Sequence, residues 1–398
     1  MAFAFDLNNP PAGFVENPYP VYRRLLAEAP VHPQPDGSVI LSRHTDLDRV
    51  YRDAARFISA KHDVFRPKFG PGSPLYLHHT TSLVFNDPPS HTRVRDIMVG
   101  AMTPRALART EPGLVALVDR LLDAMADNPA PDLIADFAAA IPVEVIGNLF
   151  DIPHAERGPL RGWSLAILGA LEPALTEAQL AQGNRAVTEF RAFLSDLIER
   201  RRANPGDPET DVLTRLMQPG AGALSPDELE QNCIFILNAG HETTSNLIGN
   251  ALELLERHRD IRAALIAEPE RMTSAVEEVL RMESPNQLGN RLTAEETEFH
   301  GHFLPAGTNL HLVIGAANRD PDRFEAPDRF RLDRRPNKHL AFGGGAHTCV
   351  GLSLARMEGR IALARFLARY PDYTLTGSAV RGGRLRFRGW ARLPARLS

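Results

Sequence analysis

The chain has 398 residues, of which 43% are hydrophobic and 24% are charged, and its formal net charge is −4. This composition is typical of a globular protein with a large core, and it excludes the disordered and fibrous classes. The charge pattern includes no basic tail, which argues against a nucleic-acid partner.

The N-terminal residues predict neither an export signal nor a membrane anchor. Residues 1–10 contain no basic stretch followed by a long apolar run. The chain has two cysteines, Cys233 and Cys349, and Cys233 falls in an apolar helical pattern, so we expect no disulfide framework. These features predict a cytoplasmic protein without membrane contact.

A short β-hairpin is the first element that the pattern predicts. Residues 31–34 and 38–42 are short runs on either side of Pro35-Asp36-Gly37, a turn sequence. Alanine, leucine, glutamate and arginine then recur with a helical period over residues 107–216, which predicts a succession of helices. The expected interruptions are Pro131, Pro142, Pro153 and the loop 204–208.

A long buried helix is predicted next. Ser225 is a suitable N-cap, Pro226 suits the first helical position, and Glu228 is the reciprocal partner of a capping box. A helix from Ser225 to about Arg257 would be roughly 45 to 50 Å long, enough to cross a whole domain. At its centre lies Ala239-Gly240-His241-Glu242-Thr243-Thr244, and polar groups buried there are unfavourable unless they are used.

The C-terminal part predicts one more helix and short strands. Glu278 and Arg281 are three residues apart and share a helix face, and this helix must end near Ser284 because Pro285 follows. On its own, such a pair is most simply an exposed ion pair. Residues 309–314 and 384–387 are predicted strands, with turns at 305–307 and 382–383.

A glycine-rich loop, Phe342-Gly343-Gly344-Gly345-Ala346-His347-Thr348-Cys349-Val350-Gly351, precedes the helical pattern of residues 351–358. Backbone without side chains can approach a flat ligand closely. Cys349 should lie near the positive end of the helix, which favours the thiolate. A thiolate is a strong axial ligand for haem iron. The alternative is a structural cysteine after a glycine-rich turn.

This loop resembles the haem-binding signature of the cytochrome P-450 superfamily: phenylalanine, glycines, a basic residue two before the cysteine, and a glycine two after it. With the motifs around Thr243, Glu278 and Arg95, the resemblance spans essentially the whole chain. It implies a bacterial member with one domain over residues 1–398, mainly α with small β elements and built around the long central helix.

The resemblance also implies a cofactor and its site. Haem b, iron protoporphyrin IX, would take Cys349 as its iron ligand. Glu242 and Thr243 match the family's acid and alcohol pair, which handles protons during oxygen activation, although Glu242 stands where aspartate is common. The cations that match propionate contacts are His91, Arg95, Arg291 and His347. The alternatives are a threonine bonded back to a helical carbonyl, and ordinary surface cations.

In the family's Glu-x-x-Arg motif, Glu278 and Arg281 belong to a buried structural network, which Arg329 would complete here. A basic patch that would suit an acidic redox partner is expected near the cysteine side, formed by Arg93, Arg334, Arg335, Lys338 and Arg356. No flavin or iron–sulfur domain is predicted, so the resemblance implies an external ferredoxin and ferredoxin reductase.

The function implied is a haem-thiolate monooxygenase that activates dioxygen with two electrons and hydroxylates a small lipophilic substrate. A peroxide-driven enzyme of the same fold and a haem-based sensor are the alternatives. The substrate pocket is expected to include apolar Leu75, Leu83, Leu168, Leu237 and Leu288, with His78, His79 and Asn290 as polar groups. Nothing in these residues selects one substrate.

Overall fold

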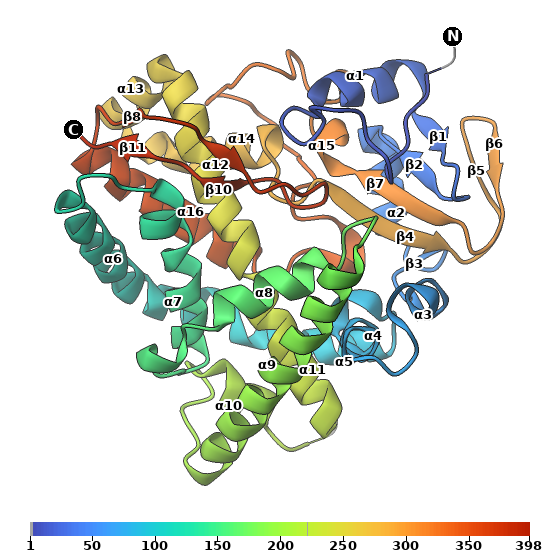
Figure 1. The fold of residues 1–398 in the computed structure, drawn as a ribbon, viewed down its shortest axis with the longest axis horizontal. Helices are drawn as coiled ribbons and strands as arrows, with labels where there is room; N and C mark the ends of the chain where they lie inside the picture. The colour runs from blue at the N-terminus through green and yellow to red at the C-terminus, as the bar shows by residue number, and fades with distance from the viewer. Residues whose placement is uncertain (1–2, 221) are drawn as a thin grey trace.

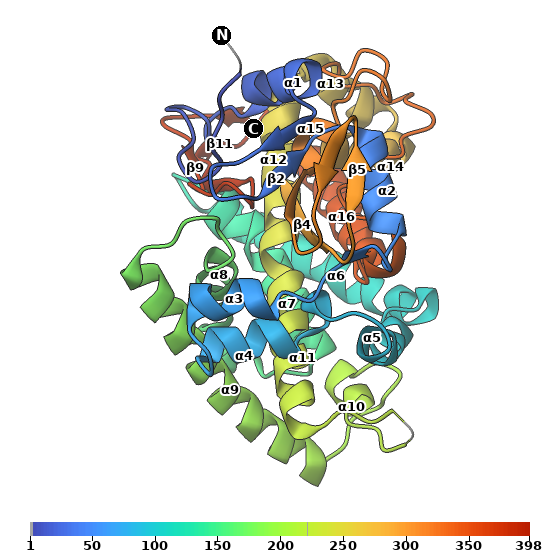
Figure 2. The same cartoon turned by 90° about the vertical axis from the view of Figure 1, so that its right-hand side faces the viewer.

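The computed structural model of the chain describes residues 3–220 and 222–398, so Met1 and Ala2 of the N-terminal segment lie outside the described residues. A column of two helices, α11 (Pro226–Ala239) and α12 (His241–Arg257), runs through the middle of the molecule, and the other elements pack around it (Figure 1, Figure 2).

The remaining helices lie on all sides of this column. In chain order they are α1 (Tyr19–Glu28), α2 (His44–Arg52), α3 (His62–Phe69), α4 (Pro74–Thr81), α5 (Ser90–Ala101), α6 (Pro104–Ala126), α7 (Ala140–Leu149), α8 (Leu160–Gly169), α9 (Glu177–Ala203), α10 (Val212–Leu216), α13 (Arg259–Ala267), α14 (Met272–Met282), α15 (Ile314–Ala317) and α16 (Leu352–Arg369).

The strands are short and gather mainly beside the N-terminal helices. They are β1 (Val31–Pro33), β2 (Val39–Leu41), β3 (Phe57–Ile58), β4 (Leu288–Thr293), β5 (Thr297–Phe299), β6 (His302–Leu304), β7 (Asn309–Val313), β8 (Thr374–Leu375), β9 (Val380–Arg381), β10 (Trp390–Arg392) and β11 (Ala395–Arg396).

The central column begins and ends where the sequence predicts. The Ser225 hydroxyl accepts the Glu228 N–H at 3.2 Å, and the Glu228 carboxylate accepts the Ser225 N–H at 2.8 Å, which completes the capping box. The column ends at Arg257. The expected single helix is interrupted at Gly240, which joins α11 to α12 in a right-handed helical conformation.

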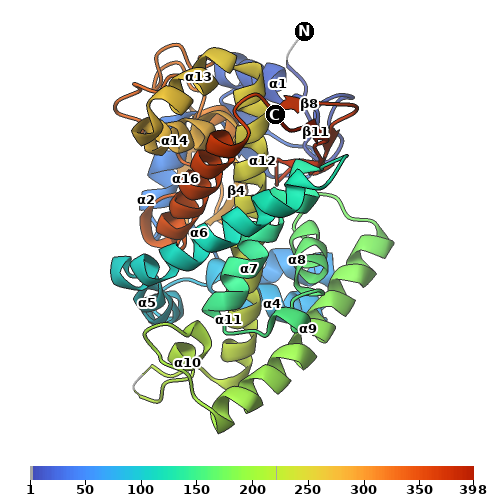
Figure 3. The same cartoon turned by 90° about the vertical axis from the view of Figure 1, so that its left-hand side faces the viewer.

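The long helices α6 and α16 lie on one side of the column (Figure 3). α16 packs against both α12 and α6, so the helix that follows the cysteine loop is fixed against the centre of the molecule (Figure 3). The apolar faces of these helices form one large cluster of buried side chains, which includes Leu247, Leu252 and Phe366. This core holds the cysteine loop and the middle of the column in a fixed relation.

A five-stranded sheet in the order β1-β2-β7-β4-β3 flanks the helices. The predicted hairpin is confirmed, since β1 and β2 pair antiparallel with Val31 opposite Leu41. Strand β2 pairs parallel with β7, and β4 pairs antiparallel with β7. This pairing brings β4, from the last third of the chain, beside elements from the first sixty residues.

Three predicted details are wrong. Pro142 does not interrupt a helix but lies in the first turn of α7, where a missing N–H is tolerated. Residues 384–387 form no strand, and only Phe387 makes an isolated bridge, to Asn286. The strand predicted over 309–314 ends at Val313, because Ile314 begins α15.

The fold class is as predicted: mainly α with small β elements around a long central helical column. Across residues 3–220 and 222–398, no helix combines the length and the apolar character that crossing a membrane requires.

Candidate functional site

A cavity of about 370 Å³ lies beside the junction of α11 and α12. Its wall includes Gly240 and Thr243 from the column, Leu288 from β4, and Cys349 from the glycine-rich loop. The side chains around it are mostly apolar, and a few polar groups point into it. A concave, apolar cavity with few polar groups is typical of a site for a cofactor or small molecule.

The cysteine loop is fixed by its own backbone and by α2. The Cys349 N–H donates to the Phe342 carbonyl at 3.0 Å, and Gly351 directly precedes α16. Gly345 has φ +63°, and a Cβ there would lie 1.9 Å from the Tyr51 carbonyl oxygen. Glycine is therefore required at 345 because the end of α2 leaves no room for a side chain. The sequence had instead suggested that glycine provides clearance for a flat ligand.

The protein alone does not favour the Cys349 thiolate, contrary to the expectation from the helix end. Desolvation raises the pKa of the thiol and outweighs the Gly351 N–H and the cations Arg95 and Arg356, which lower it. Cys349 is an exposed residue, and it lines the cavity. A metal cation on the cavity side would deprotonate the thiol outright.

The four cations predicted to hold propionates gather beside Cys349. Arg95, Arg291 and His347 line the cavity together with Cys349. His91 lies behind His347, with ring centroids 4.0 Å apart. The residues come from α5, β4 and the turn before the cysteine, so the fold brings together groups that are far apart in the chain.

Haem propionates fit this cluster. Neither ring nitrogen of the buried His91, nor Nε2 of His347, has a hydrogen-bond partner among the described residues. The nearest acid, Asp87, lies 3.9 Å from His347 Nε2. Desolvation and neighbouring cations lower the pKa of His91 to about 4. Buried nitrogens without partners and close like charges are unfavourable, and carboxylates at this place would relieve both.

The Thr243 hydroxyl lies on the cavity wall, but it donates to the Ala239 carbonyl at 2.8 Å. This local bond to a helical carbonyl is the structural alternative that the sequence left open for Thr243. It occurs at the interruption of the column. The hydroxyl oxygen remains able to accept a hydrogen bond from the cavity.

Glu242, the preceding residue, faces a different neighbour. Its carboxylate is 2.6 Å from the Arg384 guanidinium, which also donates to the Leu165 carbonyl at 2.7 Å. Desolvation raises the pKa of Glu242 to about 7, although Arg384 acts in the opposite direction. A carboxyl with this pKa exchanges protons readily near neutral pH, as a proton-handling group requires.

The buried network around Glu278 differs from the prediction in one member. Glu278 and Arg281 are fully buried and pair at 2.8 Å. The third member is Arg334, whose Nε lies 3.0 Å from the Glu278 carboxylate. Arg329 is exposed and contributes only its backbone carbonyl, which accepts from Arg281 at 3.2 Å. Arg329 therefore does not complete the network with its side chain.

The basic patch expected for an acidic redox partner also has fewer unpaired cations than predicted. Arg334 is buried in that network, Arg93 pairs with Glu228, and Arg356 pairs with Glu277 at 2.7 Å.

The cavity wall agrees with most of the predicted pocket. Leu83, Leu168, Leu288, His78, His79 and Asn290 line it. Leu75 and Leu237 do not line it; both belong to the large core cluster. Asn238 and Arg386 line the wall but were not predicted, and neither was Arg384, which pairs with Glu242. Arg384 and Arg386 lie where a strand was wrongly predicted; a basic-rich segment beside Phe387 was the only available signal.

Known proteins of one family are similar to this chain over most of its length. Residues 170–374 match the family model described as Cytochrome P450. The chain is 35% identical over 368 residues to Vitamin D(3) 25-hydroxylase of Pseudonocardia autotrophica, covering 91% of this chain and 88% of that protein. It is 34% identical to the Biotin biosynthesis cytochrome P450 of Bacillus subtilis (strain 168), covering 91% of each.

A solved structure has the same fold. The crystal structure of P450BioI in complex with hexadec-9Z-enoic acid ligated Acyl Carrier Protein superimposes with a TM-score of 0.91 at 30% sequence identity. The match covers 97% of this chain and 100% of that one.

Proposed function

The chain belongs to the cytochrome P450 family of haem-thiolate monooxygenases, and from this membership we propose that it hydroxylates a small lipophilic substrate using dioxygen and two electrons. The observation that carries the proposal is one cavity in which Cys349 lies beside Arg95, Arg291 and His347 and within a mostly apolar wall. When bound there, haem b supplies dioxygen activation and the insertion of one oxygen atom into a C–H bond.

Cys349 is proposed to hold the haem iron through its sulfur. The loop keeps the sulfur at the cavity because the Cys349 N–H is fixed to the Phe342 carbonyl and Gly345 fits against Tyr51. His91, Arg95, Arg291 and His347 are proposed to hold the propionates. The unpartnered ring nitrogens of His91 and His347 support this assignment.

Thr243 and Glu242 are proposed to handle protons. The Thr243 hydroxyl at the cavity wall can accept a hydrogen bond from one side while it donates to Ala239 on the other. Glu242 takes up and releases a proton near pH 7 at the carboxyl that pairs with Arg384. Glu242 does not line the cavity. To deliver a proton there, its carboxyl must therefore move away from Arg384.

We further propose that residues 1–398 form a single catalytic domain that takes electrons from an external ferredoxin and its reductase, as is typical of bacterial relatives. Both cysteines are free thiols, which suits the reducing cytoplasm.

The test is turnover of the haem-loaded enzyme with a ferredoxin, its reductase and NAD(P)H under ¹⁸O₂, over a panel of lipophilic compounds. Product that carries one ¹⁸O atom and depends on the reductase supports the proposal. Faster product formation with hydrogen peroxide alone would favour the peroxide-driven alternative. Ligand binding without any oxygenated product, from any compound, would favour a sensor.

A further inference from the structure

Three arginines line the cavity, Arg95, Arg291 and Arg386, and none of them forms an ion pair among the described residues. Arg386 is the one outside the cluster assigned to the propionates. Arg386 belongs to the segment between β9 and β10, and it lines the same cavity as Cys349. Its side chain is half-buried, and desolvation lowers the pKa of its guanidinium. A guanidinium remains charged even so, and a buried charge is unfavourable unless an opposite charge compensates it.

The partners of Arg386 are all neutral oxygens. Its guanidinium donates to the backbone carbonyls of Leu171, at 3.2 Å, and Leu288, and to the side-chain oxygen of Asn290. These bonds use three of the five N–H groups that an arginine offers. The remaining two N–H groups have no hydrogen-bond partner among the described residues.

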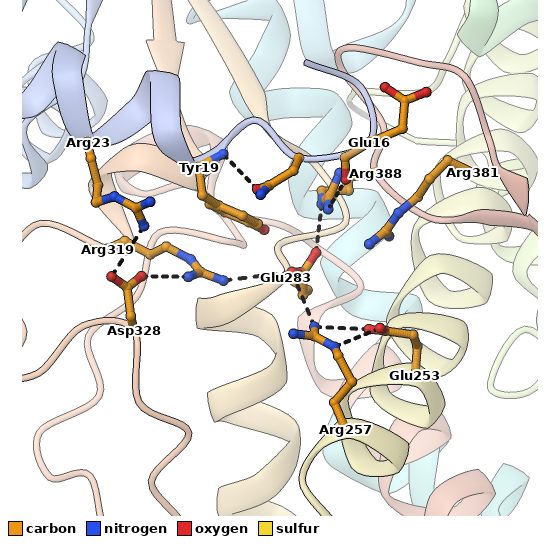
Figure 4. A pocket seen from close by; sticks show the side chains of 11 residues that line it. Glu16, Tyr19, Arg23, Glu253, Arg257, Glu283, Arg319, Asp328, Arg381 and Arg388 are labelled. Carbon is orange, nitrogen blue, oxygen red and sulfur yellow. Dashed lines mark hydrogen bonds and ion pairs between the residues drawn. The ribbon is translucent and has the colours of Figure 1, made fainter. Parts of the chain in front are cut away.

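A second cavity shows how this chain treats other arginines. In the surface pocket of Figure 4, Arg388 pairs with Glu283 at 2.6 Å and Arg319 pairs with Asp328 at 2.7 Å. In that pocket most charged side chains neutralise one another, whereas Arg381 stacks on the Trp390 ring instead. Arg386 lacks such a partner, which marks its charge as available to a ligand.

The charges around Arg386 compensate it only in part, since Glu172 raises the pKa of the guanidinium by less than desolvation lowers it. Desolvation and, after it, the charge of Arg386 lower the pKa values of the nearby Lys61 and Lys68, as expected where cations outnumber acids. The neighbouring acid is Glu172, and its carboxylate accepts the backbone N–H groups of Leu385 and Arg386 rather than the guanidinium. An anion entering the cavity would therefore meet a positive field that Glu172 compensates only in part.

We propose that this cavity binds an organic monocarboxylate, whose carboxylate is held by the two free N–H groups of Arg386 and whose apolar body extends toward Cys349. Guanidinium and carboxylate form paired hydrogen bonds of matching geometry. The mostly apolar wall requires that the rest of the molecule be hydrocarbon or aromatic. The inference deepens the proposed function, because it names the substrate class of the same site.

Arg386 is distinct from the propionate cluster. Its guanidinium donates to the side-chain oxygen of Asn290, whereas the Arg291 guanidinium donates to the Asn290 backbone carbonyl at 2.7 Å. The four cations near Cys349 include two histidines with orphaned nitrogens, and Arg386 is hydrogen-bonded to neither. Arg386 is therefore a further cation of this cavity, beyond the four assigned to the propionates.

The experiment compares carboxylates with their methyl esters as ligands of the haem-loaded enzyme. The probes are dodecanoate, hexadecanoate and 4-butylbenzoate, each beside its ester, with dissociation constants from calorimetry. Wild-type enzyme should bind at least one carboxylate more tightly than its ester. Arg386→Gln should weaken that carboxylate about 10- to 100-fold and leave the ester within about twofold. Arg386→Lys should give an intermediate loss.

Arg381→Gln is the matched control, because Arg381 lies near Arg386 in the chain but its guanidinium stacks on Trp390 in the surface pocket. It should leave both probes unchanged. Haem content and thermal midpoint report whether each variant folds.

Three outcomes would overturn the proposal: no carboxylate preferred over its ester by wild type, equal losses for acid and ester in Arg386→Gln, or haem loss as its main effect, which would place Arg386 with the propionates. Binding is measured without turnover. Failure here therefore differs from failure of the monooxygenase assignment, which would be absence of oxygenated product.

Discussion

Arg334 Nε lies 3.0 Å from the fully buried carboxylate of Glu278, and this contact makes Arg334 the third member of the Glu278–Arg281 network. The pair is far from the solvent, so each charge depends on the others for compensation. Arg334 also donates to the Glu325 carbonyl at 2.7 Å, and its contact with Glu278 ties the segment before the cysteine loop to α14.

Arg334→Ala should lower the free energy of unfolding by about 3 to 5 kcal/mol, because it leaves Glu278 buried and undercompensated. Arg329→Ala should change it by less than about 0.5 kcal/mol, because that side chain is exposed. Urea denaturation of both variants, with haem content measured beside it, checks the assignment. Equal destabilisation by the two variants would contradict it.

Much of the helical frame was predictable from short-range rules. The capping box at Ser225 and the column's end at Arg257 depend on local chemistry, and both were correctly placed. The interruption at Gly240 was not predicted, because no proline occurs between Pro226 and Pro269 and apolar residues resume at Leu247. The break predicted at Pro142 was wrong because proline disrupts the interior of a helix but is tolerated in its first turn.

The site was predictable where a motif fixes a residue's place, and not where a partner comes from elsewhere in the chain. Cys349, Arg95, Arg291 and His347 meet at one cavity as the motifs suggested. Choosing Arg334 over Arg329 depends on how an irregular loop folds over α14, for which no periodicity exists. Arg386 was missed for the same reason, since its segment forms no regular strand.

Thr243→Ala should retain haem and substrate binding while product formed per NAD(P)H consumed falls at least about tenfold, because a proton-handling hydroxyl is removed from the cavity wall. Thr243→Ser keeps a hydroxyl and should recover most of the coupling. Product and peroxide are quantified against NAD(P)H consumption. Unaltered coupling in Thr243→Ala would show that the hydroxyl serves only the Ala239 carbonyl.

Glu242 should make turnover depend on pH. Its carboxyl loses the proton as the pH rises through about 7, so the rate of a proton-limited step should fall above that pH. Arg384→Ala removes a cation that lowers the pKa of Glu242, and the fall should move to higher pH. Glu242→Gln should be slower and lack this transition. The measurement is the profile of kcat from pH 5.5 to 9 for wild type, Arg384→Ala and Glu242→Gln. If the three profiles superimpose, Glu242 takes no part in the rate-limiting step.

Glu358 on α16 should make the folded state less stable at alkaline pH. Burial raises the pKa of this carboxyl to about 8, and its Oε2 has no partner among the described residues. The folded state keeps the proton up to about pH 8, whereas the unfolded chain releases it near 4.5. Between pH 4.5 and about 8, the free energy of unfolding therefore falls as the pH rises, by at most about 1.4 kcal/mol per pH unit. Above about pH 8 the contribution of Glu358 no longer changes.

Glu358→Gln should remove this slope, so its advantage over wild type should grow from pH 5 to pH 8. Glu270→Gln, at an exposed position, is the control and should follow wild type. Thermal midpoints across this range check the prediction. A constant difference between Glu358→Gln and wild type would mean that Glu358 titrates at its ordinary pKa.

The most direct test of the central claim, that Cys349 holds haem iron through its sulfur, is the absorption spectrum of the reduced protein with carbon monoxide. Wild type and Cys233→Ala should both give the thiolate-type band, because Cys233 is buried in α11 away from the cavity. Cys349→Ala should lose it. A thiolate-type band that persists unchanged in Cys349→Ala would contradict the assignment.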